Sequence, residues 1–221
     1  MNPLRPVREL VIAALCLGCA EKGNLSVNQG GGASETIARV IICDTVPSVS
    51  IEGKIDGDYR VSLCAKTYFP VLDTGFTDSA ILGRGAPFAD FTQCKIGAYN
   101  IIVSSAADLK AVLFADISLA AFQHDTLIDT LRSMSSIAGH LYRTVNSLRT
   151  VPTGQWYAFI RGARYFASLD STGYFRLDNM AAGALTMSFV NNSRNDYGRA
   201  TDTTVNLAPG KQISGIEIII P

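Results

Sequence analysis

The sequence predicts an all-β protein that follows a short secretory leader. Its 221 residues are 48% hydrophobic and 17% charged, which provides enough apolar surface for a buried core and too little charge for a disordered chain. After the leader, short β-branched and aromatic runs alternate with Gly, Asn, Asp and Pro, and almost no long segment has a helical period. Parts of the first half also recur in the second half at the same spacing, which indicates two copies of one β-sandwich.

A signal peptide is predicted over residues 1–18. Arg5 and Arg8 supply positive charge, and residues 10–17 form an uncharged apolar run. A helix needs roughly 20 apolar residues to cross a bilayer core, so this run is too short for a transmembrane anchor and fits a secretory signal. Gly18 and Cys19 follow where the apolar character stops.

The pair Gly18 and Cys19 resembles the end of a bacterial lipobox. The resemblance implies cleavage between these two residues and acylation of Cys19, although Cys16 stands where the motif usually has Leu. More than one acyl chain on a residue gives stable anchoring, because each buried CH₂ contributes about 0.8 kcal/mol. A plain secretory signal that is cut nearby is the alternative interpretation.

Residues 19–34 are polar and Gly-rich without apolar periodicity, so we expect a flexible tether. The residue after Cys19 is Ala20 and not Asp, which by the sorting rule for lipoproteins favours the outer membrane of a two-membrane bacterium. The expected partner is therefore a lipid bilayer, reached through acylated Cys19. The expected location is the periplasmic face or the cell surface.

Ten runs rich in β-branched and aromatic residues are expected to form strands. Alternation such as Tyr99, Ile101 and Val103 points one face of a strand to a core and the other to water. The expected strands lie within residues 37–43, 59–69, 98–105, 109–119, 137–143, 155–162, 163–170, 173–178, 184–190 and 215–220.

The internal repeat rests on two matches without gaps. In the first, apolar residues and one glycine share their spacing, so that Phe91, Cys94, Gly97, Tyr99 and Ile101 match Leu177, Met180, Gly183, Leu185 and Met187. In the second, residues 117–131 match residues 205–219. Ile37–Ala38 also parallels Ile137–Ala138. We therefore expect one sandwich over residues 35–131 and another over residues 132–221.

Asp-rich turns are expected within each copy. Asp and Ser bond to nearby backbone groups and Gly accepts a positive φ. These preferences predict chain reversals at Asp78–Ser79 in the first copy and at Asp170–Gly173 in the second.

The second copy resembles a known family of small domains. Residues 169–190 (LDSTGYFRLDNMAAGALTMSFV) are similar to the signature of carboxypeptidase-regulatory-like domains, and residues 135–143 are similar to the first strand of that family. Residues 77–105 of the first copy match more loosely, with an insertion, and Lys95 and Ala181 stand where the family usually has Pro. The resemblance implies two tandem transthyretin-like (prealbumin-like) β-sandwiches, and its motifs imply no chemistry.

Composition and motifs argue against several functions. Nineteen Lys and Arg balance nineteen Asp and Glu, and no stretch combines basic and aromatic residues as a nucleic-acid groove would. His124 and His140 lack ligand partners at zinc spacing, and no calcium loop occurs. The sequence has no G-x-S-x-G motif and no Gly-rich loop between a strand and a helix. We expect no enzyme activity, no metal and no cofactor.

Apart from acylated Cys19, three cysteines remain after the expected cleavage: Cys43, Cys64 and Cys94. This is an odd count for an oxidising compartment, so at most one disulfide joins two of them, and the pairing stays open. Cys94 matches Met180 in the repeat, which favours a buried free thiol.

Aromatic residues gather in the second copy at Trp156, Tyr157, Phe159, Tyr165 and Phe166. Flat rings stack on sugar faces, so Trp156, Tyr157, Tyr165 and Phe166 form a candidate ligand surface. Alternation places Tyr157 with Phe159 on one face and Trp156 on the opposite face, so core packing is the competing interpretation.

Three functional hypotheses follow. The leading one is a membrane-anchored cell-envelope lipoprotein with a structural, adhesion or protein-interaction role, whose partners are envelope proteins or polysaccharide. The second is a surface carbohydrate-binding protein that uses the aromatic residues of the second sandwich; burial of both Trp156 and Tyr157 would exclude it. The third is an enzyme or a peptidase accessory, by analogy with the place of such domains beside carboxypeptidases, and fold alone does not transfer a function.

Overall fold

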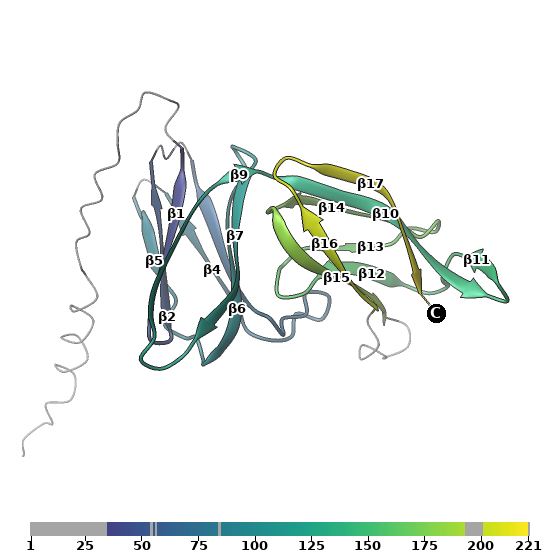
Figure 1. Cartoon of the computed structure of the whole chain (residues 1–221), viewed down its shortest axis with the longest axis horizontal. Coiled ribbons are helices and arrows are strands. Elements are labelled where there is room, and N and C mark those ends of the chain that lie inside the picture. Colours follow the sequence, from purple (N-terminus) through teal and green to yellow (C-terminus); the bar gives the residue numbers. More distant parts are fainter. Residues whose placement is uncertain (1–34, 54, 56, 84, 193–200, 221) are drawn as a thin grey trace, which may run out of the picture. The chain divides into compact units, whose positions relative to one another are not determined.

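The computed structural model describes residues 35–53, 55, 57–83, 85–192 and 201–220. These residues belong to a single compact unit. They contain strands and turns but no α-helix, and hence no helix that could span a membrane. The prediction of an all-β fold built from β-sandwiches is confirmed (Figure 1).

The first sandwich has two sheets in which every strand pair is antiparallel. The first sheet has the order β5-β2-β1-β8, with β1 (Ile37–Cys43), β2 (Val46–Glu52), β5 (Phe88–Asp90) and β8 (His124–Thr130). The second sheet has the order β4-β3-β6-β7-β9, with β3 (Tyr59–Ala65), β4 (Thr77–Leu82), β6 (Gly97–Ser105), β7 (Lys110–Leu119) and β9 (Arg132–Ser133).

The second sandwich is also built from two sheets. In one sheet, β10 (Ser135–Val145) lies between β14 (Tyr174–Met180) and β17 (Gln212–Ile220), and β11 (Leu148–Thr150) pairs with the end of β10. The other sheet has the order β13-β12-β15-β16, with β12 (Trp156–Ile160), β13 (Phe166–Ser168), β15 (Gly183–Asn191) and β16 (Thr201–Leu207). The β10–β17 pair is parallel.

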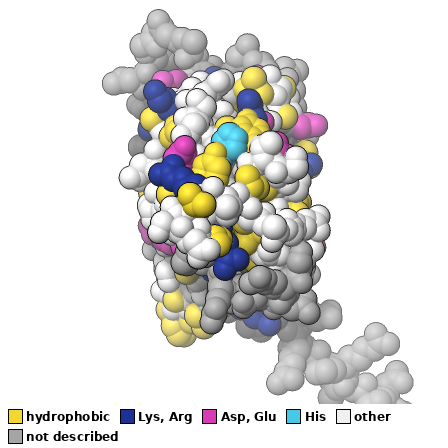
Figure 2. Space-filling model, turned by 90° about the vertical axis from the view of Figure 1, so that its right-hand side faces the viewer, with side chains coloured by type: hydrophobic (Ala, Val, Ile, Leu, Met, Phe, Trp, Pro, Cys, Tyr) yellow, Lys and Arg dark blue, Asp and Glu magenta, His cyan; other side chains and the backbone are white. Residues whose placement is uncertain are grey.

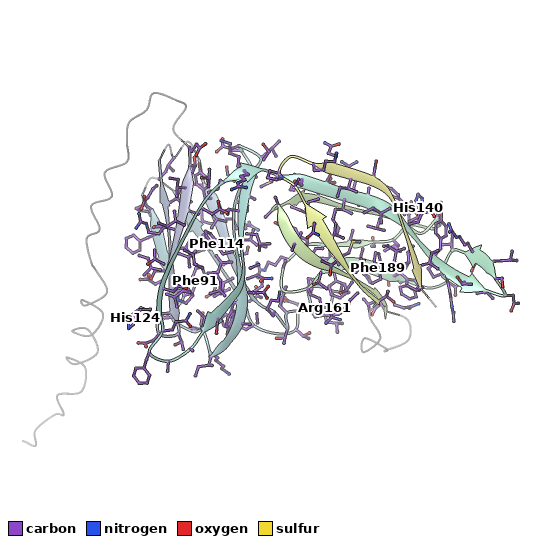
Figure 3. All side chains as sticks on the ribbon, in the orientation of Figure 1. Phe91, Phe114, His124, His140, Arg161 and Phe189 are labelled. Atoms are coloured by element: carbon purple, nitrogen blue, oxygen red, sulfur yellow. The ribbon has the colours of Figure 1, made fainter. Side chains whose placement is uncertain are left out.

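Each sandwich encloses its own hydrophobic cluster. Figure 3 labels Phe91 and Phe114, which belong to the first cluster, and Phe189, which belongs to the second. Ile102 and Ala111 come from β6 and β7 of the first sandwich, yet they pack in the second cluster. Alternation along these strands turns them outward, so the outer face of the β4-β3-β6-β7-β9 sheet packs against the second sandwich. The expected domain boundaries at residues 35, 131 and 221 stay predictions.

Several strands are too polar for the sequence pattern to reveal. Apolar residues are mixed with Ser, Thr and Asp in β2 (VPSVSIE), β4 (TDSAIL), β8 (HDTLIDT) and β16 (TDTTVNL). These polar residue types favour turns when they are read alone. Sheet pairing satisfies their backbone instead, because only one face of each strand needs to be apolar.

The predicted turn in the first copy is wrong, and the one in the second copy is confirmed. Asp78 lies within β4 and pairs with Leu63 of β3. Asp170, in contrast, reverses the chain: its Oδ1 accepts hydrogen bonds from Thr172 N at 2.8 Å and from Tyr174 N at 3.0 Å. Gly173 adopts the positive φ of 78° that this turn requires.

Strand register shows how the two copies correspond. Val49 of β2 pairs with Ala89 of β5, and Gly139 of β10 pairs with Phe175 of β14. Ala89 and Phe175 occupy equivalent positions of the repeat, so β5 matches β14 and therefore β2 matches β10. The first strand of the repeat is thus β2, which the sequence pattern did not predict.

Strand β1 is an addition to the first sandwich. It lies between β2 and β8 and is antiparallel to both, whereas β10 contacts β17 directly. Because β1 reverses the direction once more, β8 runs parallel to β2, just as β17 runs parallel to β10. The predicted match of Ile37–Ala38 with Ile137–Ala138 is therefore wrong, since β1 has no counterpart in the second copy.

A β-bulge also breaks the gapless match in the last strand. Ile137 pairs with Ile213 and Gly139 pairs with Ile216, so two residues of β17 lie opposite one residue of β10. Gly215, which the gapless match aligns with Leu127, takes a positive φ of 72° at this bulge. Ile216, and not Gly215, therefore packs against the second core at the position where Leu127 packs against the first core.

Candidate functional site

The predicted anchor cannot be placed in the structure. Gly18 and Cys19 lie outside the described residues, as do the signal peptide over residues 1–18 and the tether over residues 19–34. Cleavage before Cys19, its acylation and the outer-membrane location stay predictions.

The four aromatic residues predicted as a ligand surface lie on both faces of one sheet. Trp156 and Tyr165 are half-buried and pack against the second core. Trp156 Nε1 donates to Thr153 O at 3.0 Å, and Tyr165 Oη accepts from Ala181 N at 3.2 Å. Phe166 points to the outer face and is 53% exposed. Desolvation raises the pKa of the Tyr165 hydroxyl to about 12, so it is protonated at neutral pH.

The four rings do not form a single row. Tyr157 and Phe166 share the outer face of the sheet, whereas Trp156 and Tyr165 face the core, because alternate strand residues point to opposite sides. Neither Trp156 nor Tyr157 is fully buried, so the finding that would exclude carbohydrate binding is not observed. Phe159 also lies on the outer face but is buried against Phe69, with ring centroids 4.4 Å apart.

The two sandwiches are joined by a small set of polar contacts, which we call the joint. Asn100 of β6 donates from Nδ2 to Gly162 O at 3.0 Å, and its Oδ1 accepts from Asp116 N at 3.1 Å. Gly162 N donates to Tyr68 O at 3.2 Å. Gly162 has a positive φ of 64°, and an added Cβ would lie 2.9 Å from Asn100 Nδ2. The joint therefore needs both the amide of Asn100 and the small size of Gly162.

A cleft of about 550 Å³ lies beside the joint, and we call it the joint cleft. Its floor is the outer face of β3, β4 and β6, which contributes Arg60, Ser62 and Ser104. Side chains of the second sandwich complete it, among them Arg164 and Tyr165. The lining as a whole is Asp58, Arg60, Ser62, Ile81, Ile102, Ser104, Ala106, Met134, Arg164, Tyr165 and Asn179.

Sequence reasoning named only Tyr165 of this cleft. Arg60 and Arg164 belong to different copies, and neither lies in a motif. Nothing in the linear sequence indicates that the outer face of β3 packs against the second sandwich. The one available signal is the polar Arg60-x-Ser62 alternation opposite the apolar Tyr59, Val61 and Leu63.

The three cysteines form no disulfide with one another. Cys64 is a buried free thiol and Cys94 is a half-buried free thiol, whereas Cys43 is disulfide-bonded. Cys64 lies on the opposite face of β3 from Val61 and Leu63. Burial raises the pKa of Cys64, and burial followed by the charge of Asp78 raises the pKa of Cys94 to about 11. Neither thiol is therefore an activated nucleophile at neutral pH.

The two histidines lie in different sandwiches, and His140 belongs to an aromatic group (Figure 3). Its ring stacks on Tyr142 with centroids 6.0 Å apart and lies 5.3 Å from the ring of Tyr174. On that side of the molecule, Figure 2 shows one histidine among hydrophobic side chains. Within the described part of the chain, no group of three or more His, Cys, Asp or Glu side chains is placed to hold a metal ion.

Comparisons with known proteins give distant structural likenesses. No protein-family model matches the chain. No curated protein matches it either. The minor pilin GBS52 of Streptococcus agalactiae is 15% identical with a TM-score of 0.36, over 77% of this chain and 86% of the pilin chain. The major pilin subunit BcpA of Bacillus cereus is 9% identical with a TM-score of 0.28, over 85% of this chain and 59% of the pilin chain. Both likenesses are distant, and the strand pairings define the fold.

Proposed function

We propose that this chain is an exported, non-catalytic lipoprotein of the bacterial cell envelope with a structural, adhesion or protein-interaction role. Acylated Cys19 anchors it in the outer membrane. Its two sandwiches act together as a rigid module that presents a surface at a distance from the bilayer.

The observation that supports a rigid module is the joint. Asn100 is only 4% exposed, and its amide links the second sandwich to the bulged β7 strand. A buried, hydrogen-bonded amide resists separation of the two sandwiches, because opening the joint would break its hydrogen bonds and leave its polar groups exposed or without partners. The ring contact between Phe69 and Phe159 adds an apolar component. A hinge motion between the sandwiches would require the loss of both the Asn100 hydrogen bonds and the ring contact.

A non-catalytic role agrees with the chemistry of the described side chains. The free thiols are held protonated, and the ordered acids mostly pair with arginines or cap turns. The joint cleft holds no paired acid and base of the kind that general acid–base catalysis uses.

Labelling with radioactive palmitate tests the anchor. We expect incorporation into the wild-type protein and into Cys16→Ala, and no incorporation into Cys19→Ala. Cys16→Ala is the matched control because it removes a neighbouring cysteine that lies within the signal peptide. Equal labelling of the wild type and Cys19→Ala would refute lipidation. Recovery of labelled protein in the inner-membrane fraction would refute the outer-membrane location.

Carbohydrate binding by the second sandwich is the second candidate function. It is favoured by Phe166, which is 53% exposed, and by Tyr157 on the same outer face. Retention on insoluble polysaccharide should fall in the double variant Tyr157→Ala/Phe166→Ala. The core-facing Trp156 serves as the control position, because its replacement by Phe should leave retention unchanged. Unaltered retention of the double variant would exclude this surface.

A further inference from the structure

We infer that the joint cleft binds an acidic saccharide through Arg60 and Arg164, with the sugar carboxylate held between guanidinium groups from the two sandwiches. This site is separate from the aromatic outer face of β12 and β13. It also does not depend on the lipid anchor.

The two arginines of the cleft are free to bind an anion. Five other described arginines form ion pairs within the fold: Arg39, Arg132, Arg149, Arg161 and Arg176. Among the described residues, neither Arg60 nor Arg164 pairs with a carboxylate, and Arg164 Nε donates only to the hydroxyl of Thr77, at 3.2 Å. Guanidinium groups bind planar carboxylates through two parallel hydrogen bonds.

The lining charges favour an anion of low net charge. Asp58 is the one acid in the lining, against Arg60 and Arg164, so the cleft has a formal excess of one positive charge. The bound molecule should therefore carry a single carboxylate per recognised unit. A uronic acid residue has this charge.

The rest of the lining suits the body of a sugar. Ser62, Ser104 and Asn179 offer hydroxyl and amide groups that hydrogen-bond to sugar hydroxyls. Ile81, Ile102 and Met134 offer apolar surface for the C–H face of a ring. A cleft of about 550 Å³ lies within the range of small-ligand sites.

Asn179 is aimed into the cleft by a backbone irregularity. The β10–β14 register shifts between Ser135 and Ile137, and Asn179 lies opposite this shift with a positive φ of 55°. Such bulges redirect side chains and are frequent beside binding sites.

A saccharide fits the cleft better than a peptide does. Peptides that bind to sheets usually add a strand to a free edge. At the centre of the cleft floor no strand edge is free, because β3 pairs with both β4 and β6, and β6 pairs with both β3 and β7. The edge strand next to β3 is β4, which contributes only Ile81 to the lining. Recognition must therefore come from side chains, which here are guanidinium, hydroxyl and amide groups.

Isothermal titration calorimetry on the full-length protein in detergent tests the inference with three probes. We use trigalacturonate as the acidic saccharide, galactotriose as its neutral counterpart and tetra-alanine as a peptide with a free carboxylate. Trigalacturonate should bind at least about tenfold more tightly than galactotriose, and added NaCl should weaken the binding of trigalacturonate. Absence of trigalacturonate binding, or equal binding of galactotriose, would overturn the inference. Preferred binding of tetra-alanine would show a peptide site instead.

Arginine variants assign the binding to the cleft. Arg60→Gln and Arg164→Gln should each weaken the binding of trigalacturonate by about tenfold or more, since each removes charge-assisted hydrogen bonds. Arg143→Gln is the matched control, because Arg143 is exposed on β10, makes no ion pair with the described residues and lies outside the cleft lining. Among the described residues, the Arg60 side chain makes no hydrogen bond or ion pair, so Arg60→Gln should leave the fold intact, and an unchanged melting temperature checks this. Unchanged affinity in Arg60→Gln, or an equal loss in Arg143→Gln, would refute the site.

Discussion

The side-chain amide of Asn100 donates a hydrogen bond to the carbonyl oxygen of Gly162 at 3.0 Å, and both partners are buried. This bond joins β6 of the first sandwich to the chain just after β12 of the second. The same amide accepts from Asp116 N, where β7 takes a positive φ of 56°. One side chain thus holds both a bulged strand and the second sandwich.

Replacing Asn100 with Ala should destabilise the protein by about 1–3 kcal/mol, because Asp116 N and Gly162 O lose their partner in a buried place. Urea denaturation of the purified protein measures this change. Asn206→Ala is the control, since Asn206 is exposed on β16, and we expect a change near zero. An Asn100→Ala variant as stable as Asn206→Ala would show that water replaces the amide at no cost.

Replacing Gly139 with Ala should be more damaging than the usual Gly-to-Ala change in a strand. A Cβ at Gly139 would lie 2.2 Å from the backbone oxygen of Ile216, because β10 and β17 approach closely at the bulge. The backbone would have to shift, which we expect to cost about 1–3 kcal/mol or more. Thermal unfolding measures the loss. Gly85→Ala is the matched control, as no atom lies within 4 Å of its added Cβ; equal melting temperatures would contradict the close approach.

The sequence pattern predicts the strands whose apolar residues are continuous or strictly alternating, such as β1, β6 and β15. It fails at β2, because VPSVSIE has Ser or Pro at three of its seven positions and its partner β5 is only Phe88–Asp90. Because the sequence pattern does not reveal β2, the sequence match aligns β1 with the first strand of the second copy, where β2 is the correct counterpart. Register, unlike strand content, is fixed by contacts between distant segments, and a residue-by-residue match cannot detect a bulge such as that at Gly215.

The candidate site was less predictable than the fold. Aromatic residues attract attention in a sequence, yet Trp156 and Tyr165 pack against the core. The joint cleft depends on an outer sheet face of one sandwich meeting the second sandwich. No local pattern encodes that packing, so Arg60 and Arg164 have no signal beyond their charge.

Strand β1 should contribute to stability mainly through the face that packs in the first core. Ile42 of β1 is 1% exposed and packs in the first core, whereas Ile41 points to the partly exposed face. Ile42→Ala should cost about 2–5 kcal/mol through lost burial and the cavity left behind. Ile41→Ala on the same strand should cost about 1 kcal/mol or less. Chemical denaturation of both variants measures the difference, and equal losses would mean that β1 does not hold the register described above.

Alkaline pH should destabilise the fold partly through Cys94. Burial and the nearby charge of Asp78 raise the pKa of its thiol from 9.0 to about 11. The unfolded chain therefore releases this proton at a lower pH than the folded chain does, so stability due to the neutral thiol is fully present below about pH 9 and is lost as the pH rises through 11. Urea denaturation midpoints at a series of pH values between 7 and about 11 measure the decline. Cys94→Ser has no thiol to ionise and should decline less steeply over this window, while Tyr68 and Tyr165 titrate alike in both proteins. Parallel declines of the wild type and Cys94→Ser would show that Cys94 ionises freely in the folded state.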